Sequence, residues 1–374
     1  MRFVTNNFRR FIEEDPGRQN ISGSFNPTDE GEWGETAYVR ATARFFDAIS
    51  KNDVLSVHQM IEDGEELNRR DQVGRTPLHV AILSHSVEVG CVLIDAGALM
   101  TARLVGGRNS LHLAAQMGQV FLVKMMLERS AFNKKKVEEE KRKMEEAATA
   151  KEAEDVRMSS EDDWSAEESD DEKPHRKPPT YTKKDEPEKG DDPSKDNNEE
   201  PDILDISTRD WDFGLTALAY AILSGSLEVV DALLTAGADP NLVTYAKNVK
   251  PLHPLALTIY TQDEERAAKI AERLIAARAI SSTADENLFT IFHRIVAAGK
   301  TKIVASLLTH DTNAKKVLDS PAWCGALVFP IVSTIMAGDY ATLSLLLAHG
   351  AKLSYSPEDV SRAEEKLYAE HHRL

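Results

Sequence analysis

The stretch Arg75-Thr76-Pro77-Leu78-His79-Val80-Ala81 has the residue order of a turn followed by the start of a helix. Thr76 stands where an N-cap is expected, so its hydroxyl can accept a hydrogen bond from a free amide of the first turn. Pro77 follows at the first helical position, where a missing N–H costs nothing. Leu78 and Ala81 are three residues apart and share one helix face. The stretch predicts a short capped helix with one apolar side.

The same pattern recurs along the chain at a period close to 33 residues. Leu111 stands 33 residues after Leu78, and the segments 107–115 and 214–221 both repeat the stretch. Weaker copies are found at Pro251, Thr290 and Pro330, and a degenerate copy at Phe46 precedes them all. A fixed period of this length indicates seven stacked repeats, each burying its apolar side on its neighbours.

Three of the copies share a longer pattern. Segments 71–100, 104–133 and 211–241 follow Asp-x-x-Gly-x-Thr-Pro-Leu-His-x-Ala, then Gly, Val, Leu-Leu and Gly-Ala-Asp-x-Asn, at many positions. This pattern resembles the ankyrin repeat over roughly 245 residues of the chain. The resemblance implies an all-α solenoid of helix-turn-helix units with β-turn fingers. It also implies that the degenerate first and last copies are caps whose outer faces meet water.

A charged segment interrupts the repeats after the third copy. Residues 134–202 hold 25 Asp and Glu against 15 Lys and Arg, which is −10 of the chain's formal charge of −17. Such a segment cannot bury enough apolar surface to offset its chain entropy, so we expect a disordered acidic insertion. Pairs such as Glu138 and Arg142 in its first third favour a solvated helix, which can continue the helix before it.

The predicted organisation places a terminal segment on each side of the repeats. Residues 1–35 form a disordered N-terminal segment, 36–133 carry repeats 1–3, 134–202 are the insertion, 203–353 carry repeats 4–7, and 354–374 form a C-terminal helix. The last helix is predicted from Ser356 as N-cap and Pro357 at the first position. It either caps the solenoid or leads into a longer protein.

Composition excludes several classes of function. The 374-residue chain is acidic, which argues against direct binding to nucleic acid, and no apolar run approaches the length of a membrane span. Residues 1–11 lack the continuous apolar stretch of a secretory signal, while a weak likeness to a transit peptide stays open. Cys91 and Cys324 lie in apolar helical patterns and are expected to be free thiols in a reducing compartment, the cytoplasm or the nucleus.

The histidines do not indicate a catalytic or metal site. His79, His112, His253 and His293 all follow the apolar residue at the start of a repeat. A solenoid spaces such positions about 10 Å apart, so they cannot converge on one point. The ankyrin resemblance gives them hydrogen bonds that tie the turn together. The chain also lacks a Gly-x-Ser-x-Gly elbow and a phosphate-binding loop. We therefore predict no enzymatic activity, no metal and no cofactor.

The resemblance places partner contacts on the fingers and the first helices. The corresponding positions are Gln72, Val73, Arg75, Leu83, Ser84, Val105, Arg108, Gln116, Met117, Trp211, Asp212, Phe213, Leu215, Leu223 and Ser224. Trp211 and Phe213 stand out because large aromatic side chains dominate interface energetics. The alternative is that Trp211 folds back on the preceding repeat. Arg75 and Arg108 either clamp a partner's carboxylate or pair with finger acids such as Asp71.

The insertion offers a second candidate activity. Ser160, Ser165 and Ser169 are each followed by acidic residues, which resembles the target pattern of an acidophilic kinase of the casein-kinase-two type. The alternative is an acidic solubilising loop that is never modified. The basic runs 134–136 and 141–143 resemble a split nuclear-import signal, and a charged helix face explains them equally.

Three hypotheses for function follow from these patterns. The first is a monomeric scaffold or adaptor that binds a protein partner through the concave surface of the repeats. The second, by analogy alone, is the recognition region of a larger enzyme, such as one of the poly(ADP-ribose) polymerase type or a ubiquitin ligase. The third is a nuclear regulator that acts through its acidic loop.

Overall fold

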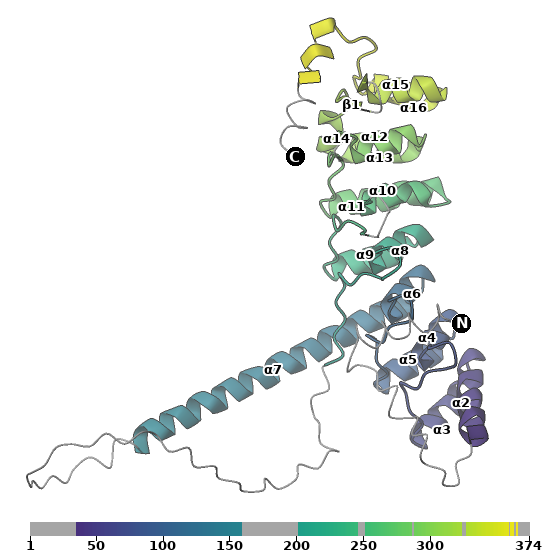
Figure 1. Ribbon diagram of the computed structural model, residues 1–374, viewed down its shortest axis with the longest axis vertical. Helices are drawn as coiled ribbons and strands as arrows, with labels where there is room; N and C mark the ends of the chain where they lie inside the picture. Colours follow the sequence, from purple (N-terminus) through teal and green to yellow (C-terminus); the bar gives the residue numbers. More distant parts are fainter. Residues whose placement is uncertain are drawn as a thin grey trace, which may run out of the picture. The chain divides into compact units, whose positions relative to one another are not determined.

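Figure 1 shows a computed structural model of the chain, which describes residues 35–158, 201–245, 251–285, 288–323, 327–358, 360–362 and 364–365. The described residues form two units. One runs up to Ser130 and resumes at Asp202, and the other begins at Ala131 and ends at Pro201. The expectations for residues 1–34, for Ser160, Ser165 and Ser169, and for Cys324 lie outside the described residues.

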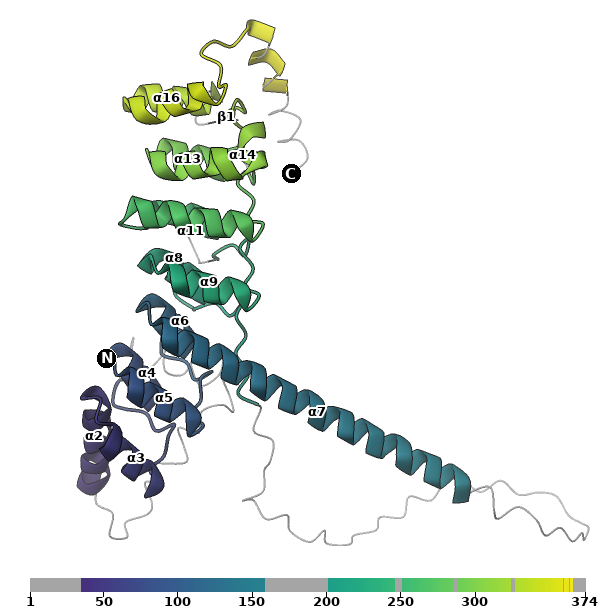
Figure 2. The same cartoon turned by 180° about the vertical axis from the view of Figure 1, so that it is seen from behind.

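The first unit is built from helix pairs that stack one after another along the chain (Figures 1 and 2). The pairs are α2 (Glu35–Ser50) with α3 (Val54–Glu62), α4 (Pro77–Leu83) with α5 (Val87–Asp95), α6 (Ser110–Gln116) with the start of α7 (Val120–Met158), α8 (Ala217–Ser224) with α9 (Leu227–Thr235), α10 (Pro254–Leu257) and η2 (Thr258–Tyr260) with α11 (Glu264–Ala276), α12 (Ile291–Ala297) with α13 (Thr301–His310), and α15 (Pro330–Ala337) with α16 (Tyr340–Ala348). Between the last two pairs the chain forms α14 (Thr312–Lys316) and the antiparallel strands β1 (Ala322–Trp323) and β2 (Leu327–Val328). These pairs are the seven predicted repeats.

The first helix of the second repeat starts where its cap predicted. Thr76 caps α4, because its hydroxyl accepts a hydrogen bond from the His79 amide at 3.4 Å, and Pro77 occupies the first helical position. The helix that follows has only 7 residues, a length that is marginal for an isolated helix in water. Its stability therefore comes from packing, and all but its last residue are buried.

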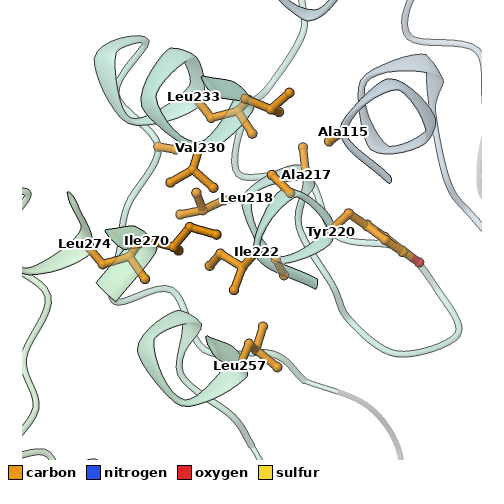
Figure 3. Packing of buried hydrophobic residues seen from close by; sticks show 14 of the residues in the cluster. Ala115, Ala217, Leu218, Tyr220, Ile222, Val230, Leu233, Leu257, Ile270 and Leu274 are labelled. Atoms are coloured by element: carbon orange, nitrogen blue, oxygen red, sulfur yellow. The ribbon is translucent and has the colours of Figure 1, made fainter. Parts of the chain in front are cut away.

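Apolar side chains from consecutive repeats form one continuous core (Figure 3). Leu218 on α8 lies between Val230 on α9 and Ile270 on α11 of the next repeat, and Ile222 on α8 lies beside Ile270. All four side chains are at most 1% exposed. Alanines such as Ala115 let the first helices of neighbouring repeats approach closely. Each repeat thus buries its apolar face on the next, as a solenoid requires.

The insertion leaves the stack of repeats and returns to it at almost the same point. The Leu204 amide donates a hydrogen bond of 2.8 Å to the Ser130 hydroxyl, across the whole insertion. Two residues earlier, the Asp202 carboxylate accepts hydrogen bonds from the amides of Met100 (2.8 Å) and Thr101 (3.0 Å), and from the Thr101 hydroxyl (2.6 Å). The stack of repeats is therefore continuous across the insertion, although the insertion separates repeats 3 and 4 in the sequence.

The second helix of the third repeat extends into the insertion. α7 has 39 residues, and it passes through the segment in which the charge spacing predicted a helical extension. Leu122, Val123 and Met126 near its start are fully buried, whereas residues 131–144 are mostly exposed. In the part of the chain that the structure describes, no helix, α7 included, has an apolar stretch long enough to cross a bilayer.

The last repeat ends on an apolar surface. Ile335 is 54% exposed and Met336 79%, whereas Ile82, at the place of Ile335 in the second repeat, is fully buried by the repeat that follows it. Beyond α16, the Tyr355 ring stacks on Phe329 with 3.6 Å between ring centroids. Residues 357–358, 360–362 and 364–365 are helical, and the remainder of the predicted 354–374 helix lies outside the described residues.

Candidate functional site

The fingers are tight turns that join one repeat to the first helix of the next, and we number each by the helix pair that it precedes. By their backbone pairing they are finger 2 (residues 70–76), finger 3 (103–109), finger 4 (209–216), finger 5 (243–253), finger 6 (284–290) and finger 7 (321–329).

In fingers 2 and 4, the first acidic residue of the finger holds the turn. In finger 2 the Asp71 amide donates to the Arg75 carbonyl at 2.9 Å. The Asp71 carboxylate accepts hydrogen bonds from the amides of Val73 (2.9 Å) and Arg75 (2.8 Å). In finger 4, Asp210 accepts in the same way from the Phe213 amide at 3.0 Å. These bonds use the backbone donors of the turn and leave the tip side chains available to solvent.

His79 links its own finger to the residue immediately before the next finger. Its Nδ1 accepts a hydrogen bond from the Thr76 amide at 3.1 Å, and its Nε2 donates to the Ala102 carbonyl at 3.1 Å. The carbonyl partner assigns the proton to Nε2. Burial lowers the pKa of His79 to about 3, so the ring is neutral at pH 7 and works as a hydrogen-bonding strut.

The same link recurs at two other repeats. His112 Nε2 donates to the Thr208 carbonyl at 3.0 Å, across the insertion, and His293 Nε2 donates to the Ser320 carbonyl at 2.8 Å. Burial lowers the pKa of His112 to about 4, and it lowers the pKa of His293 as well. The structural role implied by the ankyrin resemblance is confirmed for these histidines. Within the described residues, no three His, Cys, Asp or Glu side chains gather as metal ligands.

The prediction for His253 was wrong. His253 is the N-cap residue of α10, Pro254 is the first helical residue, and Ala256 occupies the third position, where His79 stands in α4. The fifth repeat is therefore shifted by three residues from the predicted alignment. Proline decides the register, because it fits the first helical position but breaks a bond in the helix interior.

Large apolar side chains are exposed on four consecutive fingers. Val73 is 65% exposed on finger 2, Val105 45% on finger 3, Phe213 59% on finger 4 and Tyr245 75% on finger 5. Three of these were predicted contact positions, and Tyr245 was not. The sequence signal for Tyr245 is weak. Finger 5 is longer than the others, and the fifth repeat is shifted by three residues from its predicted alignment. We call these four residues the fingertip row.

Trp211 does not belong to the fingertip row. Its amide donates to the Gly106 carbonyl at 3.0 Å, and the Arg103 guanidinium lies 5.5 Å from the centroid of its ring. The ring covers Gly107 so closely that a Cβ there would lie 2.4 Å from it. Of the two interpretations of Trp211, the structure shows the one in which it folds back on the preceding repeat.

Arg75 and Arg108 are bonded within the chain. Arg75 Nε donates to Asp71 Oδ2 at 2.7 Å, the internal pairing that the sequence left open. Arg108 Nη1 donates to the Gln116 side chain at 3.1 Å. A clamp on a partner's carboxylate would therefore have to break or share these bonds.

The other predicted positions divide between the surface and the core edge. Gln72 and Asp212 are exposed beside the fingertip row. The half-buried residues Leu83, Met117, Leu215 and Leu223 pack against the core. Ser84 donates to the Val80 carbonyl at 2.7 Å, and Ser224 donates to the Ala115 carbonyl of the preceding repeat at 3.1 Å.

Two segments of the chain match family models of the ankyrin repeat. Residues 45–137 match a model of three copies, and residues 213–245 match a model of a single repeat. The chain is an ankyrin-repeat protein.

Similar proteins share only part of the chain. Inversin from Danio rerio is 36% identical over 84 residues, which are 22% of this chain and 8% of inversin. A putative ankyrin repeat protein from Rickettsia bellii (strain RML369-C) is 33% identical over 76 residues, 19% of this chain and 11% of that protein. The crystal structure of the ankyrin repeat domain of Bcl-3 covers 77% of this chain and 92% of its own, with 18% identity and a TM-score of 0.49.

The ankyrin fingers are joined by an arginine ladder that the sequence analysis missed. Arg70 Nη1 donates to the Arg103 carbonyl at 2.9 Å, and Arg103 Nη1 donates to the Arg209 carbonyl at 3.3 Å. The ladder thus links fingers 2, 3 and 4. A signal was present, because Arg70 and Arg103 are one period of 33 residues apart.

Proposed function

We propose that this ankyrin-repeat protein is a non-enzymatic adaptor that captures a protein partner on fingers 2 to 5 and the adjoining first helices. The fingertip row carries the proposal, because it places one exposed apolar side chain on each of four consecutive fingers. Covering such side chains removes apolar surface from water, which favours association. The turns beneath them are held by their own hydrogen bonds, so little ordering is needed on binding.

The surroundings of the fingertip row support this surface over others. Gln72 and Asp212 are exposed beside the apolar tips and supply the polar rim that is typical of an interface. On second helices, exposed apolar side chains such as Leu55 on α3 and Phe121 on α7 stand alone, whereas Ile335 and Met336 on α15 are exposed together at the end of the stack. Isolated apolar residues are ordinary on protein surfaces and need no partner.

The adaptor proposal also rests on the chemistry of the buried histidines. His79, His112 and His293 bond backbone groups through their rings, so they are unsuited to act as catalytic bases. We place the binding activity in the cytoplasm or the nucleus, as the cysteine pattern suggests. Imaging of the tagged full chain in its native cells tests this location.

Affinity purification of the full chain from native cells tests the adaptor proposal. We expect Phe213→Ser and Tyr245→Ser to lose partners that the wild-type chain retains, because each removes one apolar contact. The matched control is Leu55→Ser, which changes a side chain that is 84% exposed but lies on α3, away from the fingers. Recovery of the same partners by both finger variants would overturn the proposal.

A further inference from the structure

At two junctions, the space between neighbouring fingers is filled by two large side chains. At the junction of repeats 2 and 3, Arg70 reaches the Arg103 carbonyl and His79 reaches the Ala102 carbonyl. At the junction of repeats 3 and 4, Arg103 and His112 make the equivalent bonds to the carbonyls of Arg209 and Thr208. Both side chains come from the earlier repeat of the pair.

The junction of repeats 5 and 6 has small side chains at both places. Val243 stands in the position of Arg70, because the next residue, Thr244, donates its amide across finger 5 to the Leu252 carbonyl at 2.9 Å. Ala256 is the third residue of α10, the position of His79 in α4.

A cavity of about 400 Å³ lies where these larger side chains are missing. Its apolar lining includes Val243, Leu252, Ala256 and Ile291, together with the Phe289 ring of finger 6. Its volume is within the range of pockets that hold small ligands. The cavity therefore has room for one aromatic side chain.

One edge of the cavity is polar. Arg294 pairs with Asp285 at 3.0 Å and lies 5.8 Å from the centroid of the Phe289 ring. Beside it, His253 Nδ1 is buried and has no hydrogen-bond partner. A buried polar atom without a partner is uncommon in folded proteins and indicates a missing group.

The protonation of His253 determines which group would complement it. The Asn241 backbone favours a proton on the ring, and because the Asn241 amide already donates to Asp239 at 2.8 Å, its carbonyl is the group that does so. Since Nδ1 has no partner, we assign this proton to His253 Nε2. Burial, and then the charge of Arg294, lower the pKa of His253. At neutral pH its Nδ1 therefore presents a lone pair, which accepts a hydrogen bond but cannot donate one.

We propose that this cavity receives a tyrosine or tryptophan side chain from the protein partner, with the ring between the apolar walls and the O–H or N–H donating to His253 Nδ1. The proposal rests on the adaptor function and adds an anchor to it. The partner reaches the cavity from the fingertip row, because the exposed Tyr245 belongs to finger 5, which also carries Val243 and Leu252. Aromatic anchors that fill a pocket are a common source of binding energy at interfaces.

Methyl NMR of the full chain with small probes tests the pocket chemistry. p-Cresol carries the ring and hydroxyl of tyrosine, and toluene lacks the hydroxyl. We expect p-cresol to shift the methyl signals of Val243, Leu252 and Ile291 and to bind about threefold to tenfold more tightly than toluene, the effect of one hydrogen bond. The methyl of Ile303 in α13, which is buried elsewhere in the core, is the internal control. Absence of shifts at the cavity, or equal binding of the two probes, would overturn the proposal.

Two variants close the cavity in different ways. Val243→Arg places at finger 5 the arginine that fingers 2, 3 and 4 carry at this position, and Ala256→Leu fills the space from the helix side. We expect either variant to abolish the p-cresol shifts while the chain keeps its thermal unfolding transition. Unchanged p-cresol binding in a folded variant would contradict the assignment of the cavity.

Selection of random peptides on the full chain separates the anchor from the adaptor function. We expect selected peptides to contain tyrosine or tryptophan and to lose binding to Val243→Arg or Ala256→Leu. Peptides that bind these variants normally but are lost with Phe213→Ser would overturn the anchor and leave the adaptor function standing. If p-cresol binds but no selected peptide depends on the cavity, the site takes a free aromatic molecule, and the proposal of a protein anchor fails.

Discussion

Two junctions of this ankyrin array differ in a way that the chain's continuity does not explain. Between repeats 3 and 4 the chain leaves for the whole of residues 131–201, yet Arg103 bonds finger 4 and His112 bonds Thr208 immediately before it. Between repeats 5 and 6 no such excursion occurs, yet a cavity remains beside Val243 and Ala256. The comparison teaches that the side chains at the positions of Arg70 and His79 decide how closely two repeats join. A short connection between two repeats does not by itself fill the space between them.

Gly107 is the position at which the closed junction should break most severely. Its φ is +77°, and an added Cβ would lie 2.7 Å from the Trp211 amide nitrogen as well as against the ring. We expect Gly107→Ala to lower the free energy of unfolding by about 3 kcal/mol, from left-handed strain and overpacking together. The measurement is urea unfolding of the full chain.

A second glycine separates the two contributions at Gly107. Gly97 has φ +95° and nothing within 4 Å of an added Cβ. Gly97→Ala should therefore cost only the backbone strain, about 1 kcal/mol. Equal losses for the two substitutions would show that Trp211 does not press on Gly107.

The closed junction should also be sensitive to acid. The pKa of His112 is lowered from 6.5 to about 4 in the folded chain, so the unfolded chain binds more protons between these values. Stability therefore rises with pH through this window and is lost on acidification. Between pH 7 and pH 5 this histidine should account for a loss of about 2 kcal/mol. Thermal unfolding of wild type and His112→Asn across this range measures the difference in slope.

The hollow junction has no such histidine, because Ala256 occupies its place. His58 on α3 is a suitable control, since its side chain is 60% exposed. His112→Asn should change the slope more than His58→Asn does. An unaltered slope in His112→Asn would mean that another group causes the acid sensitivity.

Asp202, at the end of the insertion, should contribute to the stability of the folded array. Asp202→Ala leaves the amides of Met100 and Thr101 without their acceptor. We expect a loss of about 1–2 kcal/mol in urea unfolding. The matched control is Asp205→Ala, because Asp205 is exposed and bonds only locally to Ser207 among the residues described. A loss no larger than that of the control would show that the hydrogen bonds of Asp202 do not stabilise the array.

The smallest effect is expected on filling the hollow junction. Val243→Arg places at finger 5 the side chain that joins fingers 2 and 3. If it spans the cavity as Arg70 spans its own junction, stability should rise by about 0.5–1 kcal/mol. Hydrogen exchange of repeats 5 and 6 provides the measurement, with Arg70→Val as the reverse substitution. A gain from Val243→Arg without a loss from Arg70→Val would contradict the equivalence of the two positions.

The array was predictable because its signals are local and repeated. The capped start at Thr76 and Pro77, the apolar faces of the short helices and the glycine-bearing turns recur often enough to outweigh any single ambiguity. The same logic correctly assigned His79 and His112 to the scaffold. It failed for His253, because Leu-His also occurs there, whereas Pro254 is the residue that starts the helix and sets its register.

The candidate site was predictable in outline only. The fingers were indicated as the variable edge, and Val73, Val105 and Phe213 are indeed exposed there. The assignment of Trp211 to packing depends on Gly107 of another repeat, and the cavity beside Val243 depends on residues of two repeats. Neither relation is local, so no pattern within one repeat could reveal it.

Sequence by itself determined the repeat, its caps and its period, because backbone geometry and apolar spacing act within about a dozen residues. Tertiary structure alone decided which side chains at the edges of the repeats are used for stacking and which remain free to bind. Arg103 and Trp211 pack against each other, whereas Tyr245 stays in solvent and the space beside Ala256 stays open. The physical reason is that stacking depends on which residues face each other across a junction, and those residues are separated by a full repeat or more.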